Sequence, residues 1–175
     1  MREVDFSTLQ MNPYTLFDKE WPLITAGTRE RGYNTMTVSW GQTGSLWGHK
    51  ESGATVVVYV RPQRYTKSFV DREELFTLSF LPEKYKKELA YLGTRSGRDG
   101  DKFAACGITP LFTDGTTAVK EARMVLVCKK LFRTTLKEED FIDPEVVAEC
   151  YPERDFHDLY IARIEKCYVS DEDVR

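Results

Sequence analysis

Short strand-like segments separated by turns fill the first half of this 175-residue chain. Valine, threonine and aromatic residues, which favour strands, are concentrated in four segments. These are PLITAGT (22–28), NTMTVSW (34–40), ATVVVYV (54–60) and LFTLSFL (75–81). The segment RERGYN joins the first two as a turn in which Gly32 can adopt a positive φ. Strands this short, with few helices between them, predict a mainly-β fold, either a closed or half-closed antiparallel barrel or a β-sandwich.

The rest of the chain adds a few helices to these strands. Pro82 suits the first turn of a helix in which Tyr85, Leu89 and Leu92 recur at helical spacing, and Gly93 follows as its C-cap. Shorter helices are predicted at 66–72, 101–106 and 143–150, the last with Asp143 as its N-cap. The segment 118–136 fits a helix or a strand, and its β-rich run at 124–128 favours one long strand. Residues 40–53 form a glycine-rich loop, and residues 158–169 form the closing strand.

The composition of the chain and the spacing of its cysteines and histidines argue against several classes of protein and of binding partner. With 25 basic and 28 acidic residues, the net charge of -3 gives no general attraction to nucleic acid or to a membrane surface. No apolar run reaches the ~20 residues that a spanning helix needs. The first ten residues lack the apolar core of a signal peptide. The four cysteines are far apart and the two histidines add no metal-ligand spacing, so we expect a cytoplasmic protein with reduced thiols and no metal site.

The segment YVRPQRYT (59–66) leaves a strand that looks buried and immediately presents two guanidinium groups. Arg61 and Arg64 are followed by Tyr65 and Thr66 at a predicted strand-to-helix junction. Arginine offers a planar fork of donors that matches a phosphate, and the N–H groups at the start of a helix can complete its coordination. The segment therefore indicates an anion site. The alternative is that both arginines pair with surface carboxylates.

Two further segments carry ligand-binding side chains. In YNTMTVSWG (33–41), Thr35, Thr37 and Ser39 share one face of an extended strand, which suits a polyol or a heteroaromatic edge, while the opposite face looks like core. In SGRDGDKF (96–103), a glycine-bent loop can bring Lys102 to a ligand phosphate. The alternatives are an ordinary edge strand with a solvated hydroxyl face and a plain surface turn. The second segment lacks the oxygen ligands of a calcium loop.

Taken in order, these segments resemble those of the flavin reductase-like family, and within it the flavoredoxin-type proteins. The order is N-x-M-T-x-S-W, V-x-V-R-P-x-R-x-T, F-x-x-S-F-L and S-G-x-D-x-D-K-F, followed near the C-terminus by HDLYIARIE (157–165). The likeness extends from about residue 21 to about residue 166. It implies an FMN-binding split β-barrel with added helices, as a single domain over residues 1–175. It also implies a homodimer with each flavin near the subunit interface.

Carried onto this chain, the resemblance assigns the strand at 34–40 to the isoalloxazine ring and ribityl chain. The segment around Arg64 would face the phosphate end, with Lys102 adding positive charge. The implied cofactor-binding residues are Asn34, Met36, Thr37, Ser39, Trp40, Arg61, Arg64, Tyr65, Thr66 and Lys102.

The chemistry that the resemblance implies is that of an FMN-dependent oxidoreductase, in which the cofactor carries the redox step and the protein positions it. Electrons would come from NAD(P)H or from a protein donor and pass to an unknown acceptor. Because no dinucleotide fingerprint G-x-G-x-x-G occurs, a nicotinamide would have to stack on the flavin in an open cleft. One alternative is a non-catalytic FMN electron carrier between protein partners. Another is a small-barrel binding module without flavin, for instance for nucleic acid, although no basic groove is evident.

Two histidines and one tryptophan each have more than one possible role. His157 is a candidate for a polar contact to flavin or nicotinamide, and equally for a structural histidine at a strand start. Trp47 and His49 can cover the flavin or pack at a dimer contact. No residue is required as an acid or base, so none is assigned as catalytic beyond the candidacy of His157.

Overall fold

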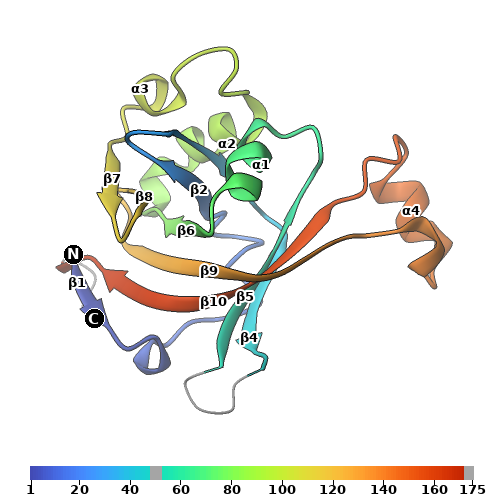
Figure 1. The fold of residues 1–175 in the computed structure, drawn as a ribbon, viewed down its shortest axis with the longest axis horizontal. Coiled ribbons are helices and arrows are strands. Elements are labelled where there is room, and N and C mark those ends of the chain that lie inside the picture. Colours follow the sequence, from blue (N-terminus) through green and yellow to red (C-terminus); the bar gives the residue numbers. More distant parts are fainter. Residues whose placement is uncertain (48–52, 172–175) are drawn as a thin grey trace.

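The computed structural model describes residues 1–47 and 53–171, and one large antiparallel sheet dominates it (Figure 1). The strand order is β3-β2-β6-β9-β10-β5-β4, with β1 paired to β10. The strands of this sheet are β1 (Arg2–Val4), β2 (Leu23–Thr28), β3 (Gly32–Thr37), β4 (Gly41–Ser45), β5 (Ala54–Val60), β6 (Leu75–Phe80), β9 (Met124–Thr135) and β10 (Asp158–Val169). A separate hairpin is formed by β7 (Pro110–Thr113) and β8 (Thr116–Val119).

Four helices accompany the sheet, and within the described residues none is long and apolar enough to cross a membrane. They are α1 (Tyr65–Arg72), α2 (Lys86–Thr94), α3 (Lys102–Cys106) and α4 (Pro144–Cys150). Three single 3-10 turns lie at Phe6–Thr8, Glu83–Tyr85 and Glu138–Asp140.

Alternate residues of six strands meet in one hydrophobic core. In β5 these are Val56, Val58 and Val60, all fully buried, and β10 contributes Tyr160 and Ala162. β2, β3, β6 and β9 add residues to the same cluster, so the sheet curls around a common interior. This arrangement confirms the predicted mainly-β barrel and rules out the β-sandwich alternative. A second cluster lies beneath α2, α3 and β8.

Most of the predicted elements are present. β2, β5, β6 and β10 lie within or match their predicted segments, and Gly32 has a φ of 75° at the start of β3. The helices at 66–72, 101–106 and 143–150 are α1, α3 and α4. The Asp143 side chain accepts a 3.0 Å hydrogen bond from the backbone N–H of Glu145, as an N-cap does.

Four predictions about local structure were wrong. The strand predicted at 34–40 ends at Thr37, and the loop predicted at 40–53 contains β4, whose sequence GQTGS has little intrinsic strand preference but pairs with β5. The segment 118–136 is not one strand, because a turn separates β8 from β9. Gly93 lies inside α2 rather than after it, and a Cβ there would lie 3.3 Å from the Cβ of Thr37, so this glycine allows close packing.

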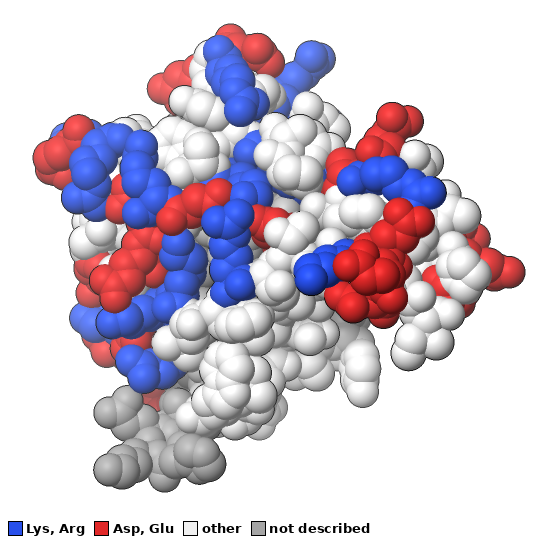
Figure 2. Space-filling model, turned by 45° about the vertical axis from the view of Figure 1, so that its right-hand side comes forward, with Lys and Arg blue, Asp and Glu red and all other residues white. Residues whose placement is uncertain are grey.

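β9 and β10 extend beyond the barrel and carry α4 between them, and this segment projects from the body of the molecule (Figure 1). We call residues 137–155 the acidic arm, because they include eight acidic and two basic residues. Figure 2 shows acidic side chains gathered on the right-hand side of the molecule, next to a broad uncharged area.

Candidate functional site

Two adjoining pockets lie where β3, the exit of β5 and the start of α1 meet. We call the first, of about 250 Å³, the aromatic pocket, lined by Met36, Thr37, Val38, Ser39, Trp40, Tyr59, Arg61, Arg64 and His157. We call the second, of about 120 Å³, the basic pocket, lined by Asn34, Met36, Gln63, Arg64, Tyr65, Thr66, Thr94, Arg95, Ser96, Gly97, Arg98 and Lys102. Because Met36 and Arg64 line both, the two pockets form one continuous site.

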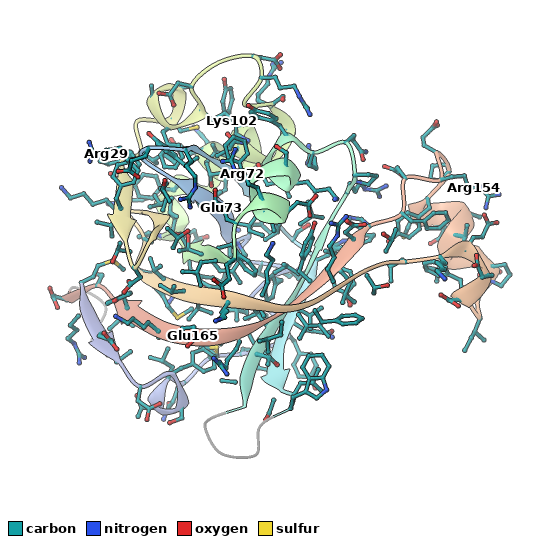
Figure 3. All side chains as sticks on the ribbon, viewed as in Figure 1. Arg29, Arg72, Glu73, Lys102, Arg154 and Glu165 are labelled. Atoms are coloured by element: carbon teal, nitrogen blue, oxygen red, sulfur yellow. The ribbon has the colours of Figure 1, made fainter. Side chains whose placement is uncertain are left out.

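Lys102, which is labelled in Figure 3, and Arg64 both line the basic pocket and bring positive charge to it. Lys102 is 5% exposed, and its ammonium donates to the carbonyls of Leu92 at 2.8 Å and Arg95 at 3.1 Å, which leaves one of its three N–H groups for a ligand. Arg64 donates to the carbonyl of Gly93. Within the described residues, neither cation forms an ion pair with a carboxylate.

The pKa values of both cations reflect this burial. Desolvation, with the Arg64 charge as a second cause, lowers the pKa of Lys102 to about 8. Desolvation, with the Arg61 charge second, also lowers the pKa of Arg64. Buried charges are normally paired, because leaving water is costly for an ion. Two partly desolvated cations without a carboxylate partner are therefore suited to a bound anion.

Asn34 and Thr66 tie β3 to the first turn of α1 at the floor of the basic pocket. The Asn34 amide donates a 2.8 Å hydrogen bond to the Thr66 hydroxyl, and both side chains are buried. A Cβ at Gly97 would lie 2.3 Å from the Asn34 amide oxygen, so only glycine lets the loop approach this closely. Arg98, from the same loop, lies over the Tyr65 ring at 4.6 Å. The loop is thereby held against the pocket.

Arg61 occupies a different place from Arg64. It lines the aromatic pocket, pairs with the Asp155 carboxylate and donates a 2.8 Å hydrogen bond to the Cys150 carbonyl. The sequence suggested that both arginines face the phosphate end, with carboxylate pairing as the alternative. The structure differs from the first interpretation for Arg61, because the acidic arm neutralises its charge. Arg64 alone of the pair reaches the basic pocket.

The aromatic pocket contains a buried, neutral histidine. The Nδ1 of His157 lies 2.9 Å from the Tyr151 hydroxyl, and its ring centroid lies 4.7 Å from that of Trp40. Desolvation, with the Arg61 charge second, lowers the pKa of His157 to about 4. The imidazole is therefore uncharged at neutral pH and suits a hydrogen-bonding or stacking role rather than that of a cationic acid.

The predicted hydroxyl face of β3 is only partly open to the pockets, because Thr37 and Ser39 line the aromatic pocket whereas Thr35 does not. Thr35 is fully buried and shares a 2.8 Å hydrogen bond with Thr25, and the Thr37 hydroxyl donates to the Leu89 carbonyl at 2.5 Å. α2 covers this face, so those hydroxyl groups are already satisfied. Asn34 and Met36, on the face interpreted as core, line the pockets as well.

All ten residues predicted to bind a cofactor line one or other of the two pockets. Residues that were not predicted also line them, among them Tyr59, Ser96, Gly97 and Arg98. Alternation along ATVVVYV could have identified Tyr59, which points away from the buried valines. Trp47 lies outside both pockets, with its ring 6.3 Å from that of Phe132. His49 lies outside the described residues.

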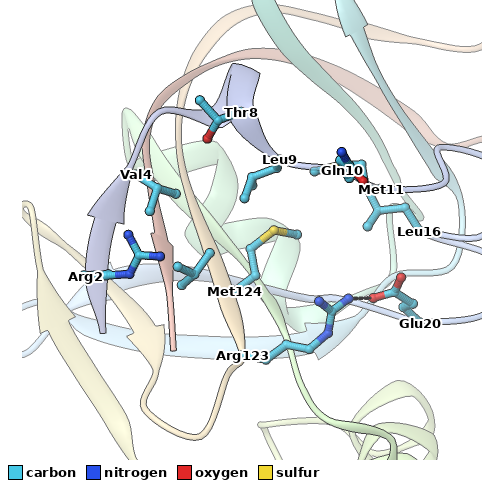
Figure 4. A pocket seen from close by; sticks show the side chains of 11 residues that line it. Arg2, Val4, Thr8, Leu9, Gln10, Met11, Leu16, Glu20, Arg123 and Met124 are labelled. Atoms are coloured by element: carbon cyan, nitrogen blue, oxygen red, sulfur yellow. Dashed lines mark hydrogen bonds and ion pairs between the residues drawn. The ribbon is translucent and has the colours of Figure 1, made fainter. Parts of the chain in front are cut away.

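A third cavity, of about 560 Å³, lies beside the N-terminal segment (Figure 4). Apolar side chains such as Leu9, Met11 and Met124 form much of its wall, and Arg123 pairs with Glu20 at its edge. It shares no lining residue with the aromatic and basic pockets.

Comparison with known proteins decides the family. The model of the flavin reductase like domain matches residues 16–175. The chain therefore belongs to the flavin reductase-like family. No curated protein sequence matches it significantly. The family membership supports flavin binding, and it agrees with the resemblance seen in the sequence motifs.

Solved structures of the flavin reductase-like family share the fold. Flavoredoxin of Desulfovibrio vulgaris (Miyazaki F) has a TM-score of 0.67 and 20% identity, over 89% of this chain and 72% of that chain. An FMN-binding protein from Thermus thermophilus has a TM-score of 0.66 and 20% identity, over 98% and 83%. The styrene monooxygenase flavin reductase from Pseudomonas putida S12 has a TM-score of 0.63 and 20% identity, over 90% and 84%. Such low identity establishes the split-barrel fold alone.

Proposed function

We propose that this protein binds FMN across the two pockets, with the phosphate in the basic pocket and the isoalloxazine ring in the aromatic pocket. The observation that carries the proposal is the pair Arg64 and Lys102, two partly buried cations without a carboxylate partner beside a pocket walled by aromatic rings. A phosphate monoester supplies the missing negative charge. Flavoproteins among the similar structures support the choice of FMN over other anions.

Each part of the ligand has side chains suited to it. Arg64 and the free N–H of Lys102 would hold phosphate oxygens, with Tyr65 and Thr66 at the first turn of α1, where backbone N–H groups are free. Met36 lines both pockets and Asn34 lines the basic pocket, so these two residues would contact the ribityl chain. The remaining assigned residues, Thr37, Ser39, Trp40 and Arg61, would surround the ring.

FMN, when bound, would supply the ability to accept a hydride and pass electrons onward. The protein would contribute position and charge. Trp40 and Tyr59 flank the ring position, and neutral His157 offers its second ring nitrogen as a hydrogen-bonding group. The ion pair of Arg61 with Asp155 keeps a guanidinium near the ring, where negative charge develops on reduction.

We propose that the reaction is electron transfer from NAD(P)H through FMN to an acceptor, in a cytoplasmic homodimer. Similar structures that include a flavin reductase support an enzyme, and those that include flavoredoxin keep the non-catalytic carrier as the second candidate. All four cysteines are free thiols, which suits a reducing compartment. Basic and acidic side chains are interspersed on the face shown in Figure 2 and the net charge is -3, which does not favour a nucleic-acid groove.

The test is the visible absorption spectrum of purified protein loaded with FMN, recorded anaerobically before and after addition of NADH and then NADPH. An enzyme loses the oxidised-flavin absorbance within its turnover time. A carrier keeps that absorbance with both nucleotides but loses it with dithionite. A protein that acquires no flavin absorbance when incubated with FMN contradicts the proposal altogether.

A further inference from the structure

The cavity beside the N-terminal segment, which we call the N-terminal cavity, is large enough for a small molecule. Its volume of about 560 Å³ is more than twice the 250 Å³ of the aromatic pocket, and small-molecule sites commonly enclose about 300–1,000 Å³. No residue lines both this cavity and the aromatic or the basic pocket. A molecule bound here would therefore not compete directly with a flavin.

Backbone hydrogen bonds hold the N-terminal segment over the cavity at both ends. At one end β1 pairs with the last residues of β10. The Asp5 carboxylate then caps a 3-10 turn by accepting a 2.9 Å hydrogen bond from the backbone N–H of Ser7. At the other end the N–H of Leu16 donates to the carbonyl of Asn12 at 3.2 Å. The cavity is therefore enclosed by a fixed backbone rather than by a loose terminus.

The wall of the cavity is largely apolar and is backed by the barrel core. Leu16 is fully buried and Met124 is 4% exposed, and both belong to the main hydrophobic cluster. Leu9 and Met11 are partly buried against that cluster. Figure 4 shows Leu9 and Met124 converging from the N-terminal segment and from β9. Unbranched methionine side chains adapt to irregular shapes, so this wall suits an apolar body of variable form.

The strand register places a guanidinium group at the edge of this apolar wall. Arg2 on β1 lies opposite Val169 on β10, and Val169 lies opposite Met124 on β9. Residues directly opposite one another on neighbouring strands share a face of the sheet. The Arg2 side chain is therefore on the same face as Met124, and it lines the cavity (Figure 4).

The charges around the cavity leave one positive charge in excess. Arg123 pairs with Glu20 at the rim, so those two charges compensate each other. Within the described residues Arg2 forms no ion pair, and its neighbour Glu3 pairs with Lys166 instead. The guanidinium fork matches the geometry of a carboxylate, to which it can donate two parallel hydrogen bonds. A single negative group beside an apolar body would fit both the charge and the wall.

We propose that the N-terminal cavity is a binding site for an amphipathic monocarboxylate, a molecule with one carboxylate head and an apolar body. The head lies against Arg2, and the body lies between Leu9 and Met124. Straight-chain and aromatic carboxylates share this chemistry, and the experiment distinguishes them. The inference is independent of the proposed flavin function, because the cavity and the flavin pockets have no lining residue in common.

The experiment is isothermal titration of the protein with octanoate and with para-butylbenzoate, in the presence of saturating FMN and again without FMN. One molecule should bind per chain, with the same affinity in both conditions. The tighter of the two ligands identifies a straight-chain or an aromatic body, and either result supports the inference. Octanol, which has the chain but no carboxylate, should bind at least tenfold more weakly than octanoate.

Two variants separate the head from the body. Arg2→Gln should weaken octanoate at least tenfold and leave octanol unchanged, whereas Arg29→Gln, at an exposed arginine outside the cavity, should change neither. Leu9→Trp fills the cavity and should weaken octanoate and octanol alike, whereas Leu131→Trp, at an exposed leucine of β9 outside the cavity, should weaken neither. Circular dichroism identifies a variant that fails to fold, and Leu9→Phe then replaces Leu9→Trp.

Three results would overturn the inference. The first is that neither carboxylate binds at millimolar concentration. The second is that saturating FMN abolishes the binding, which would place the carboxylate in the flavin pockets. The third is an unchanged octanoate affinity in Arg2→Gln, which would leave Arg2 as a charge that protects the edge strand β1 from pairing with another chain. A protein that binds octanoate as described but never binds FMN would contradict the proposed function and support this inference.

Discussion

The amide of Asn34 donates a 2.8 Å hydrogen bond to the hydroxyl of Thr66, which joins two segments 32 residues apart at the floor of the basic pocket. Both side chains are buried, so removing one leaves the other without its partner. We expect Asn34→Ala and Thr66→Val each to lower the free energy of unfolding by about 1–3 kcal/mol. In the double variant the losses should be clearly less than additive. Urea unfolding of the four proteins measures this, and strictly additive losses would show that the two residues are not coupled.

Arg64→Ala separates a ligand contact from a structural one. If Arg64 holds the phosphate, the variant should bind FMN about tenfold more weakly or worse, because each ~1.4 kcal/mol is a factor of ten. The melting temperature without ligand should change little, and the stabilisation by saturating FMN should shrink. Lys87→Ala, on the exposed side of α2, is the control. Parental FMN affinity in Arg64→Ala would assign the guanidinium to its hydrogen bond with Gly93 alone.

If FMN binds as proposed, Lys102 should make its affinity depend on pH. Burial and the Arg64 charge lower the pKa of its ammonium to about 8, and a bound phosphate would raise it again. The affinity for FMN should therefore be highest between about pH 6.5, above which the phosphate is mainly a dianion, and pH 8, and should fall as the pH rises above 8, by at most about tenfold per pH unit. In Lys102→Met the decline should disappear. Riboflavin serves as the ligand control, since it shares the ring but not the phosphate. A parental decline that persists in Lys102→Met would point to another group.

His157 should make the fold sensitive to mild acid. Burial and the Arg61 charge lower its pKa to about 4, below the ~6.5 of an unfolded histidine, so the unfolded state binds more protons between these values. The contribution of neutral His157 to stability is full above pH 6.5 and is lost as the pH falls toward 4. Urea unfolding of the parent and of His157→Gln between pH 4 and 7.5 should show a smaller acid loss in the variant. If the free energy of unfolding has the same pH dependence in the parent and in the variant, then His157 takes up its proton over the same pH range in the folded and the unfolded protein.

The sequence predicted which residues come together at the candidate site better than it predicted the details of the strands. Arg64, Thr66 and Lys102 come from segments whose residue types and order were recognisable, and the structure brings them to one pocket. Which segments pair as strands in the sheet could not be predicted from residue types and their order in the same way. β4 has weak strand propensity and exists because β5 provides a partner, which is a long-range effect.

The orientation of β3 could not be read from alternation. Period-two alternation separates its two faces, but it does not say which face α2 will cover. The Thr37–Leu89 hydrogen bond shows that α2 contacts the hydroxyl face, and Asn34, on the opposite face, lines the basic pocket. The ion pair of Arg61 with Asp155 joins residues 94 apart, so no local pattern could assign that arginine to the arm.

The most direct test of the central claim compares FMN and riboflavin as ligands of the same flavin-free protein. The claim is that Arg64 and Lys102 recognise a phosphate beside a flavin ring. Isothermal titration at pH 7 should give an affinity for FMN at least tenfold higher than for riboflavin, since hydrogen bonds to a charged group contribute about 1.5–3 kcal/mol each. Equal affinities for the two flavins would contradict the claim.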